Sequence, residues 1–278
     1  MWARTRGFKE SGFVRGEDRL SSSTMMRSFV ILVFMASSTN ALPVNETEIL
    51  PSYLKPCRQD DPSLNECIRN SINTLIRNIK SGSEVLGVPS IDPLAVPVAD
   101  LSFDSGNLTL LLTLKDISIM GMSQINVTSV KASLADYKFE IASKTPFFEV
   151  HGMFICDGGV LTFPLHSSGA FFVNMTDVTA VWILYYHEEV PSSGGPSHFK
   201  IDDFGLDIIP SDIQFDFGAE MDGDNELGEA MNTFLNGNSH EIFNDVKPRI
   251  TDLLGHIFSD LGNSVLASYS ASTLLPEK

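Results

Sequence analysis

The sequence has 278 residues, 43% of them hydrophobic, and a formal net charge of −16 at pH 7. A chain of this length and composition can bury one large core or two small ones. Its acidic balance repels phosphate backbones and anionic membrane surfaces, which argues against nucleic acid as a partner.

A hydrophobic segment near the N-terminus has the layout of a secretory signal peptide. Arg27 precedes an apolar run over residues 29–36, and small residues follow up to Ala41. The run has no amphipathic period, which argues against a core helix, and it is shorter than the about 20 residues that span a bilayer. We therefore predict a leader over residues 1–41, cleaved after Ala41, and a single secreted domain over residues 42–278.

The first part of this leader is polar and charged, which is unusual for a signal peptide. One interpretation is that residues 1–24 are a gene-model extension and that translation starts at Met25 or Met26. No later stretch reaches transmembrane length, so we expect no stable membrane insertion.

Four Asn-x-Ser/Thr triplets agree with export, because this triplet is the acceptor for N-linked glycans in secreted proteins. They begin at Asn45, Asn107, Asn126 and Asn174. We expect some of these four asparagines to carry a glycan on an exposed turn or strand edge.

Three interpretations are open for Cys57 and Cys67, which are ten positions apart: a disulfide, a metal pair or a redox couple. A zinc site needs further Cys or His at ligand spacing, and a redox couple is typically Cys-x-x-Cys; neither is present. Secretion favours the disulfide. The remaining cysteine, Cys156, is then a free thiol, expected to be a small buried hydrophobe, with an intermolecular bridge as the alternative.

The first predicted element is a helix. Apolar residues recur at helical spacing between Leu64 and Ile79, and Asp61 or Ser63 supplies the N-cap. Three prolines follow within residues 87–97. They exclude a regular helix or a central strand, so this segment is predicted to be an extended connector.

From about residue 98 to residue 217 the sequence alternates between apolar runs and turn residues. The first two runs flank a turn signal at residues 104–107, which predicts a hairpin. Continuous apolar runs such as residues 110–112 predict strands that are covered on one face and partly covered on the other. Further turns are predicted at Pro146 and at residues 157–159, 167–169 and 192–196.

The C-terminal part returns to helical spacing between Leu227 and Val265. Pro248 lacks an N–H, so it is expected to kink this helix or to begin a new one. From Pro248 to about Ser268 the helix would be roughly 30 Å long. A short N-terminal helix, many antiparallel strands and a long amphipathic helix predict an α+β fold, in which a strongly curved antiparallel sheet wraps around the C-terminal helix.

No motif of the sequence supports an enzyme. Residues 222–226 resemble the start of an EF-hand loop, but Leu227 stands where that loop needs glycine. His151 and His166 flank Cys156, but a Cys–His nucleophile needs a spatial proximity that sequence neighbourhood does not establish. We expect no catalytic residues, no metal and no cofactor.

Large flexible apolar residues are abundant, with 19 Phe and 10 Met. Most are expected to form an ordinary core. A bent sheet that holds one helix can also leave an apolar cavity, which would suit a hydrophobic ligand. From helix and strand periods alone we place these residues on such a cavity: Leu75, Leu110, Leu112, Phe148, Phe154, Phe172, Trp182, Ile250, Leu254, Ile257, Phe258 and Leu261.

Several short motifs occur in a characteristic order. The cysteine pair follows the signal peptide and leads into the first helix. GVPSIDPL at residues 87–94 and GMS at residues 121–123 are similar to a Gly-(Ile/Val)-Pro…Asp-Pro-Leu segment and a Gly-Leu-Ser turn. Residues 146–164 resemble a Gly-x-Tyr-x-x-x-Gly…Leu-x-Pro block, and residues 226–236 resemble a C-terminal block. Over about residues 50–270 the chain thus resembles the insect takeout and haemolymph juvenile-hormone-binding protein family.

This resemblance implies a tubular lipid-binding (TULIP) fold, in which a curved sheet around a long helix encloses an apolar tunnel. It also implies a secreted carrier of hydrophobic ligands such as terpenoids or fatty-acid-like molecules. The family's first disulfide carries over to Cys57 and Cys67. Juvenile-hormone binders proper have a second disulfide, which the lone Cys156 cannot make, so the takeout branch is favoured. Phe154 stands where the family often has Tyr.

We therefore expect a monomeric carrier that binds a hydrophobic small molecule by apolar burial, without covalent chemistry. Three alternatives stay open. The first is a dedicated juvenile-hormone-binding protein, and the second is a secreted signalling or structural glycoprotein that binds no ligand. The third is a hydrolase that acts through Cys156 or a histidine.

Overall fold

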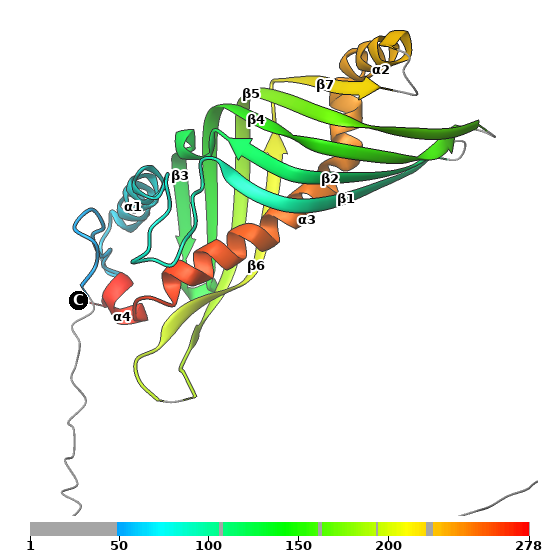
Figure 1. The fold of residues 1–278 in the computed structure, drawn as a ribbon. Helices are drawn as coiled ribbons and strands as arrows, with labels where there is room; N and C mark the ends of the chain where they lie inside the picture. Colours follow the sequence, from blue (N-terminus) through cyan, green and yellow to red (C-terminus); the bar gives the residue numbers. More distant parts are fainter. Residues whose placement is uncertain (1–48, 106–107, 161–162, 193, 221–224, 278) are drawn as a thin grey trace, which may run out of the picture. The chain divides into compact units, whose positions relative to one another are not determined.

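A short helix, a run of antiparallel strands and a long helix follow one another in the order expected from the sequence (Figure 1). The described residues, from 49 onward, belong to one compact unit. The predicted leader and two of the sequon asparagines, Asn45 and Asn107, lie outside them. The computed structural model describes residues 49–105, 108–160, 163–192, 194–220 and 225–277.

The described residues form four α-helices, one ahead of the strands and three after them. The first follows Asp61, whose carboxylate accepts a hydrogen bond from the N–H of Ser63 (2.7 Å) directly ahead of the helix. The helices are α1 (Leu64–Asn78), α2 (Asn225–Gly237), α3 (Ser239–Leu266) and α4 (Ala271–Leu274), with short 3₁₀ turns at Met122–Gln124 and Leu134–Asp136.

Seven antiparallel strands form one sheet in which two strands are unusually long. β4 pairs along its length with β5, and each of the two also pairs with two shorter strands: β4 with β3 and β2, β5 with β7 and β6. β1 and β2 form the expected first hairpin. The strands are β1 (Leu94–Ser105), β2 (Leu108–Met120), β3 (Asn126–Ser133), β4 (Lys138–Val160), β5 (Phe163–Glu189), β6 (His198–Ile209) and β7 (Asp212–Glu220).

Several predicted turns are wrong, because they lie inside these long strands. Pro146 and residues 157–159 are part of β4, and residues 167–169 are part of β5. A Cβ atom on Gly169 would lie 2.1 Å from the carbonyl oxygen of Gly218 in β7. Glycine there permits close approach of a neighbouring strand rather than a chain reversal. The connection predicted at residues 192–196 does lie between β5 and β6.

Two prolines also lie inside regular elements. β1 includes Pro97, but β1 pairs only with β2, and the pairing passes from Val96 to Val98. An edge strand tolerates a proline in this way. α3 begins at Ser239 and continues through Pro248, so the proline does not begin a helix. Figure 1 shows α3 changing direction along its length, as expected of a helix that contains proline.

Asparagine side chains on the helices cover the free edges of the sheet. The amide of Asn73 in α1 accepts a hydrogen bond from the N–H of Val127 in β3 (2.8 Å) and donates one to its C=O (3.0 Å). These amides replace a neighbouring strand, satisfy backbone groups that would otherwise be open to another chain, and hold the helix in place. The same pair of bonds joins Asn232 to Phe217, Asn236 to Phe215, and Asn263 to Ile201.

The concave face of the sheet packs on α3. Phe243 and Leu254 of α3 belong to the same buried cluster as Phe148 of β4 and Ile208 of β6. This confirms the expected α+β architecture of a curved sheet wrapped around a long helix.

A second, smaller cluster closes one end of the molecule. It contains Cys57, which is bonded to Cys67, so the favoured disulfide is present. The N–H of Cys57 also donates to the C=O of Leu274 in α4 (3.1 Å). The N-terminal arm and the C-terminal tail are thereby fastened together at the end where α1 and α4 lie (Figure 1).

Candidate ligand-binding site

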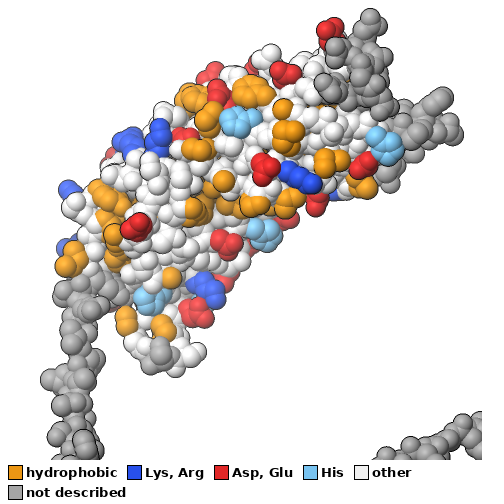
Figure 2. Space-filling view, in the orientation of Figure 1, with side chains coloured by type: hydrophobic (Ala, Val, Ile, Leu, Met, Phe, Trp, Pro, Cys, Tyr) orange, Lys and Arg blue, Asp and Glu red, His pale blue; other side chains and the backbone are white. Residues whose placement is uncertain are grey.

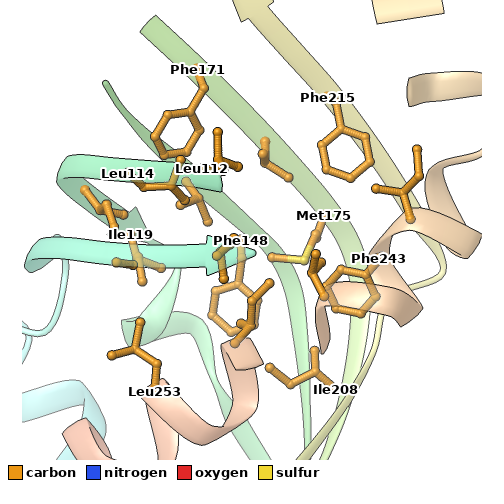
Figure 3. A pocket seen from close by; sticks show the side chains of 18 of the residues that line it. Leu112, Leu114, Ile119, Phe148, Phe171, Met175, Ile208, Phe215, Phe243 and Leu253 are labelled. Atoms are coloured by element: carbon orange, nitrogen blue, oxygen red, sulfur yellow. The ribbon is translucent and has the colours of Figure 1, made fainter. Parts of the chain in front are cut away.

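An apolar cavity of about 630 Å³ lies between the sheet and α3. Small-molecule sites typically have volumes of about 300–1,000 Å³. In Figure 3 the side chains of Phe148, Met175, Phe243 and Phe215 point toward a common space from the strands and from α3. The cavity is therefore built by both layers of the fold and depends on their separation.

Strand alternation decides which side chains of β5 reach the cavity. Phe171, Val173 and Met175 line it. Successive side chains in a strand point to opposite faces, so Phe172 and Asn174 face outward. The same rule places apolar residues of β2, β4 and β6 on the wall.

Aromatic rings make up part of the wall. Phe154, only 1% exposed, packs edge-on against Phe217 with ring centroids 5.0 Å apart. Trp182 packs against Phe258 of α3 at 5.1 Å. Its indole N–H donates to the hydroxyl of Ser143 (2.8 Å), so this polar group is already satisfied by the protein. Edge-to-face pairs of this kind stabilise a fixed arrangement of rings.

The cavity opens to solvent at the corner between α2 and α3. Of its described lining residues, only Phe234, Glu241 and Asp245 are exposed, and we call these three the mouth. Phe234 is 63% exposed despite its size. Asn238 lies between them, at the junction of the two helices. The mouth is thus at the opposite end of α3 from the disulfide (Figure 1).

Cys156 lines the cavity as a free, buried thiol. Burial, with a smaller effect from Asp157, raises its pKa, which keeps the thiol protonated. Asp157 and His166 form the next pair along β4 and β5, and the His166 ring nitrogen Nδ1 lies 2.7 Å from the Asp157 carboxylate on the outer face. His151 alternates with the lining residue Val150 and also faces outward. The hydrolase alternative requires a histidine that faces the thiol, and neither His151 nor His166 does so.

The predicted lining residues fall into two groups. Leu75, Ile257 and Leu261 pack against the core without lining the cavity, and Phe172 lies on the outer face. The side chain of Leu110 lies outside the described residues. Contact of any of these residues with a ligand stays a prediction. Those that do line the cavity are Leu112, Phe148, Phe154, Trp182, Ile250, Leu254 and Phe258.

The sequence analysis missed other lining residues. In β5 a signal was available: Asn174 begins a glycosylation triplet and is expected to face solvent, which places Phe171 and Met175 on the inner face. No comparable signal identifies Glu241 and Asp245, because acidic residues on an amphipathic helix are normally on its solvated face.

Export and glycosylation stay predictions. Asn126 is exposed at the start of β3, and Asn174 is half-buried on the outer face of β5. Within the described part of the chain, no helix has the length and apolarity to cross a membrane. The same residues contain no cluster of three or more potential metal ligands.

An antiparallel sheet curled around one long helix, with an apolar cavity between them, defines the tubular lipid-binding class of fold. The chain belongs to the haemolymph juvenile hormone binding protein family, whose model matches residues 29–276. The crystal structure of Takeout 1 from Epiphyas postvittana is similar, with a TM-score of 0.68 at 20% identity, covering 80% of this chain and 99% of that one. The predicted fold and family are confirmed.

Two relatives are similar over most of their length. One is the circadian clock-controlled protein daywake of Drosophila melanogaster, 26% identical over 235 residues, which are 81% of this chain and 88% of that protein. The other is the putative beta-carotene-binding protein of Schistocerca gregaria, 22% identical over 218 residues, 77% of this chain and 85% of that protein.

Proposed function

We propose that this protein is a secreted carrier that holds one hydrophobic small molecule, terpenoid or fatty-acid-like, in the cavity between the sheet and α3. The observation that carries the proposal is the cavity itself, about 630 Å³ with an almost wholly apolar wall. Transfer of apolar surface from water into such a wall is favourable by roughly 25 cal/mol per Å². Binding by burial needs no covalent step and no cofactor, so we propose that the protein is not an enzyme.

The names of the relatives support the same class of ligand. The family is named for binding juvenile hormone, and the locust relative for binding beta-carotene. The chain has one disulfide, and its remaining cysteine, Cys156, is free. A takeout-like carrier is therefore favoured over a dedicated juvenile-hormone-binding protein. Saturable high-affinity binding of labelled juvenile hormone would reverse that preference.

The test uses two alanines on opposite faces of β5. Ala180 is buried and lines the cavity, whereas Ala170 is exposed on the outer face. Ala180→Phe adds a ring inside the cavity, and Ala170→Phe adds the same ring outside it. In fluorescence titrations with N-phenyl-1-naphthylamine, we expect saturable binding by the parent protein and by Ala170→Phe. Ala180→Phe should bind at least about tenfold more weakly, because it occupies ligand space.

Circular dichroism and thermal melts establish that both variants fold. Absence of saturable binding by the parent protein would favour a signalling or structural glycoprotein without ligand. Equal binding by Ala180→Phe and Ala170→Phe would place the probe elsewhere and contradict the proposal.

A further inference from the structure

The polar side chains that line the cavity are gathered at one end and carry no positive charge. Among the described lining residues they are Asn238, Glu241 and Asp245, and none is Lys, Arg or His. The rest of the described wall is apolar, apart from the protonated thiol of Cys156. The polar end of a bound ligand therefore meets hydrocarbon inside the cavity, or the Asn238 amide and two carboxylates at the mouth.

The lysine and the arginine of α3 nearest the mouth are engaged outside the cavity, and His240, which precedes Glu241, is exposed and does not line the cavity. The ammonium nitrogen of Lys247 lies 2.9 Å from a carboxylate oxygen of Asp207. The guanidinium of Arg249 donates to the hydroxyl of Ser102. The first turn of α3 offers the partial positive charge of a helix N-terminus, but Glu241 lies in that turn and offsets it.

A free carboxylic acid is ionised at neutral pH and would be penalised at either end. Inside the cavity its carboxylate would lose water without gaining a cation, which costs several kcal/mol in general. At the mouth it would lie near two like charges. An alcohol, ester or ketone avoids both penalties. The amide of Asn238 donates to the C=O of Phe234 (2.8 Å), and its oxygen can also accept a hydrogen bond from a ligand hydroxyl.

We propose that the ligand is an uncharged lipid, a long-chain or isoprenoid alcohol, ester or ketone, and that Glu241 and Asp245 exclude free carboxylic acids. This inference rests on the proposed carrier function and narrows its ligand class. The two acidic residues act as specificity determinants at the mouth. Apolar burial supplies the affinity.

The test compares probes with the same carbon chain and different head groups. Hexadecan-1-ol, methyl hexadecanoate and hexadecanoic acid compete with N-phenyl-1-naphthylamine at neutral pH. We expect the acid to bind at least about tenfold more weakly than the alcohol. The double variant Glu241→Gln/Asp245→Asn should reduce this difference in affinity between the alcohol and the acid by about threefold or more, because it removes both charges at the mouth.

The control is Asp252→Asn/Asp260→Asn, which changes the net charge equally at exposed positions of α3 that do not line the cavity. This control should leave the difference in affinity between the alcohol and the acid unchanged. Equal or tighter binding of the acid, or an equal reduction of this difference by the control, would overturn the inference and leave the carrier function intact. Absence of binding by every probe would overturn the carrier function, and the inference with it.

Discussion

Tyr186 is the most strongly perturbed ionisable side chain of the closed end. It is 7% exposed and packs between Phe139, stacked at 5.0 Å, and Phe199, edge-on at 5.3 Å. Burial, with smaller effects from Tyr137 and Glu188, raises its pKa to about 12. The apolar surroundings stabilise the neutral phenol relative to the phenolate.

Because of this raised pKa, the free energy of unfolding is expected to decrease at alkaline pH. The unfolded chain loses the phenol proton near pH 10 and the folded chain near 12, so the stabilisation is complete below about 10 and is lost as pH rises to about 12. Between pH about 9 and about 11.5, urea unfolding of the parent protein should lose about 2 kcal/mol more than that of Tyr186→Phe. The exposed neighbour provides the control, since Tyr185→Phe should behave like the parent. Equal losses in all three proteins would contradict the burial of Tyr186.

The reactivity of the Cys156 thiol measures access to the cavity, because Cys156 lines it. Cys156 is 5% exposed, and its raised pKa keeps the reactive thiolate scarce. Without reduction, we expect one thiol per chain to react with Ellman's reagent in urea, and reaction at least about 100-fold slower in the native protein. Prior binding of hexadecan-1-ol should also slow the labelling of Cys156 by N-phenylmaleimide. A count of more than one thiol, or fast native labelling by Ellman's reagent, would contradict this placement.

At the scale of elements, α2 is attached to the sheet by polar contacts. Asn232 and Asn236, one helical turn apart, pair with Phe217 and Phe215, two residues apart on β7. The rise of one helical turn is about 5.4 Å and that of two strand residues about 6.8 Å, so both amides reach the same strand edge. Met231, Phe234 and Leu235 of the same helix line the cavity, so these amides hold part of its wall.

Loss of these amides should loosen α2. Asn232→Ala/Asn236→Ala removes hydrogen bonds worth about 1 kcal/mol each and is expected to speed amide hydrogen exchange in α2 and β7. Exchange in α1 should be unchanged, because Asn73 holds that helix independently. Asn244→Ala on the exposed surface of α3 is the matched control. Exchange in α2 that matches the control variant would contradict a docking role for the two asparagines.

Element order and type could be predicted, because long periodic segments retain their hydrophobic pattern in the fold. Turns could be predicted less well. Pro146, Gly158 and Gly169 have turn propensity, but in the fold they belong to strands whose length is set by pairing with two neighbours each. At these positions strand pairing in the tertiary structure outweighs the local turn propensity. The contacts of Asn232 and Asn236 with the sheet edge could not be predicted from the sequence either, because asparagine on a helix normally faces solvent.

The lining residues could be predicted only in part, for a related reason. Period shows which residues share a face but not which face is turned inward, so it selected Phe172, whereas Phe171 lines the cavity of the structure. On α3 the cavity extends along the helix from its start, ahead of Pro248, as far as Phe258. Ile257 and Leu261 pack against the core instead of lining the cavity. Cavity extent depends on how far sheet and helix separate, which no local pattern encodes.

For the whole molecule, the disulfide-bonded end and the mouth lie at opposite ends of α3. The Cys57–Cys67 disulfide and its hydrogen-bonded partner Leu274 lie at the closed end, and Glu241 and Asp245 lie at the other. Figure 2 shows acidic side chains spread over the visible face rather than gathered in one patch. With a formal net charge of −16 for the full sequence, such a surface disfavours docking on anionic surfaces.

We propose that one hydrophobic molecule occupies the space between the sheet and α3. Native mass spectrometry of the secreted protein, before and after passage over a delipidating resin and after re-addition of hexadecan-1-ol, tests it most directly. We predict one ligand per chain after re-addition to the parent protein and to Ala170→Phe, and none for Ala180→Phe. A parent protein that stays ligand-free both as isolated and after re-addition would contradict the claim.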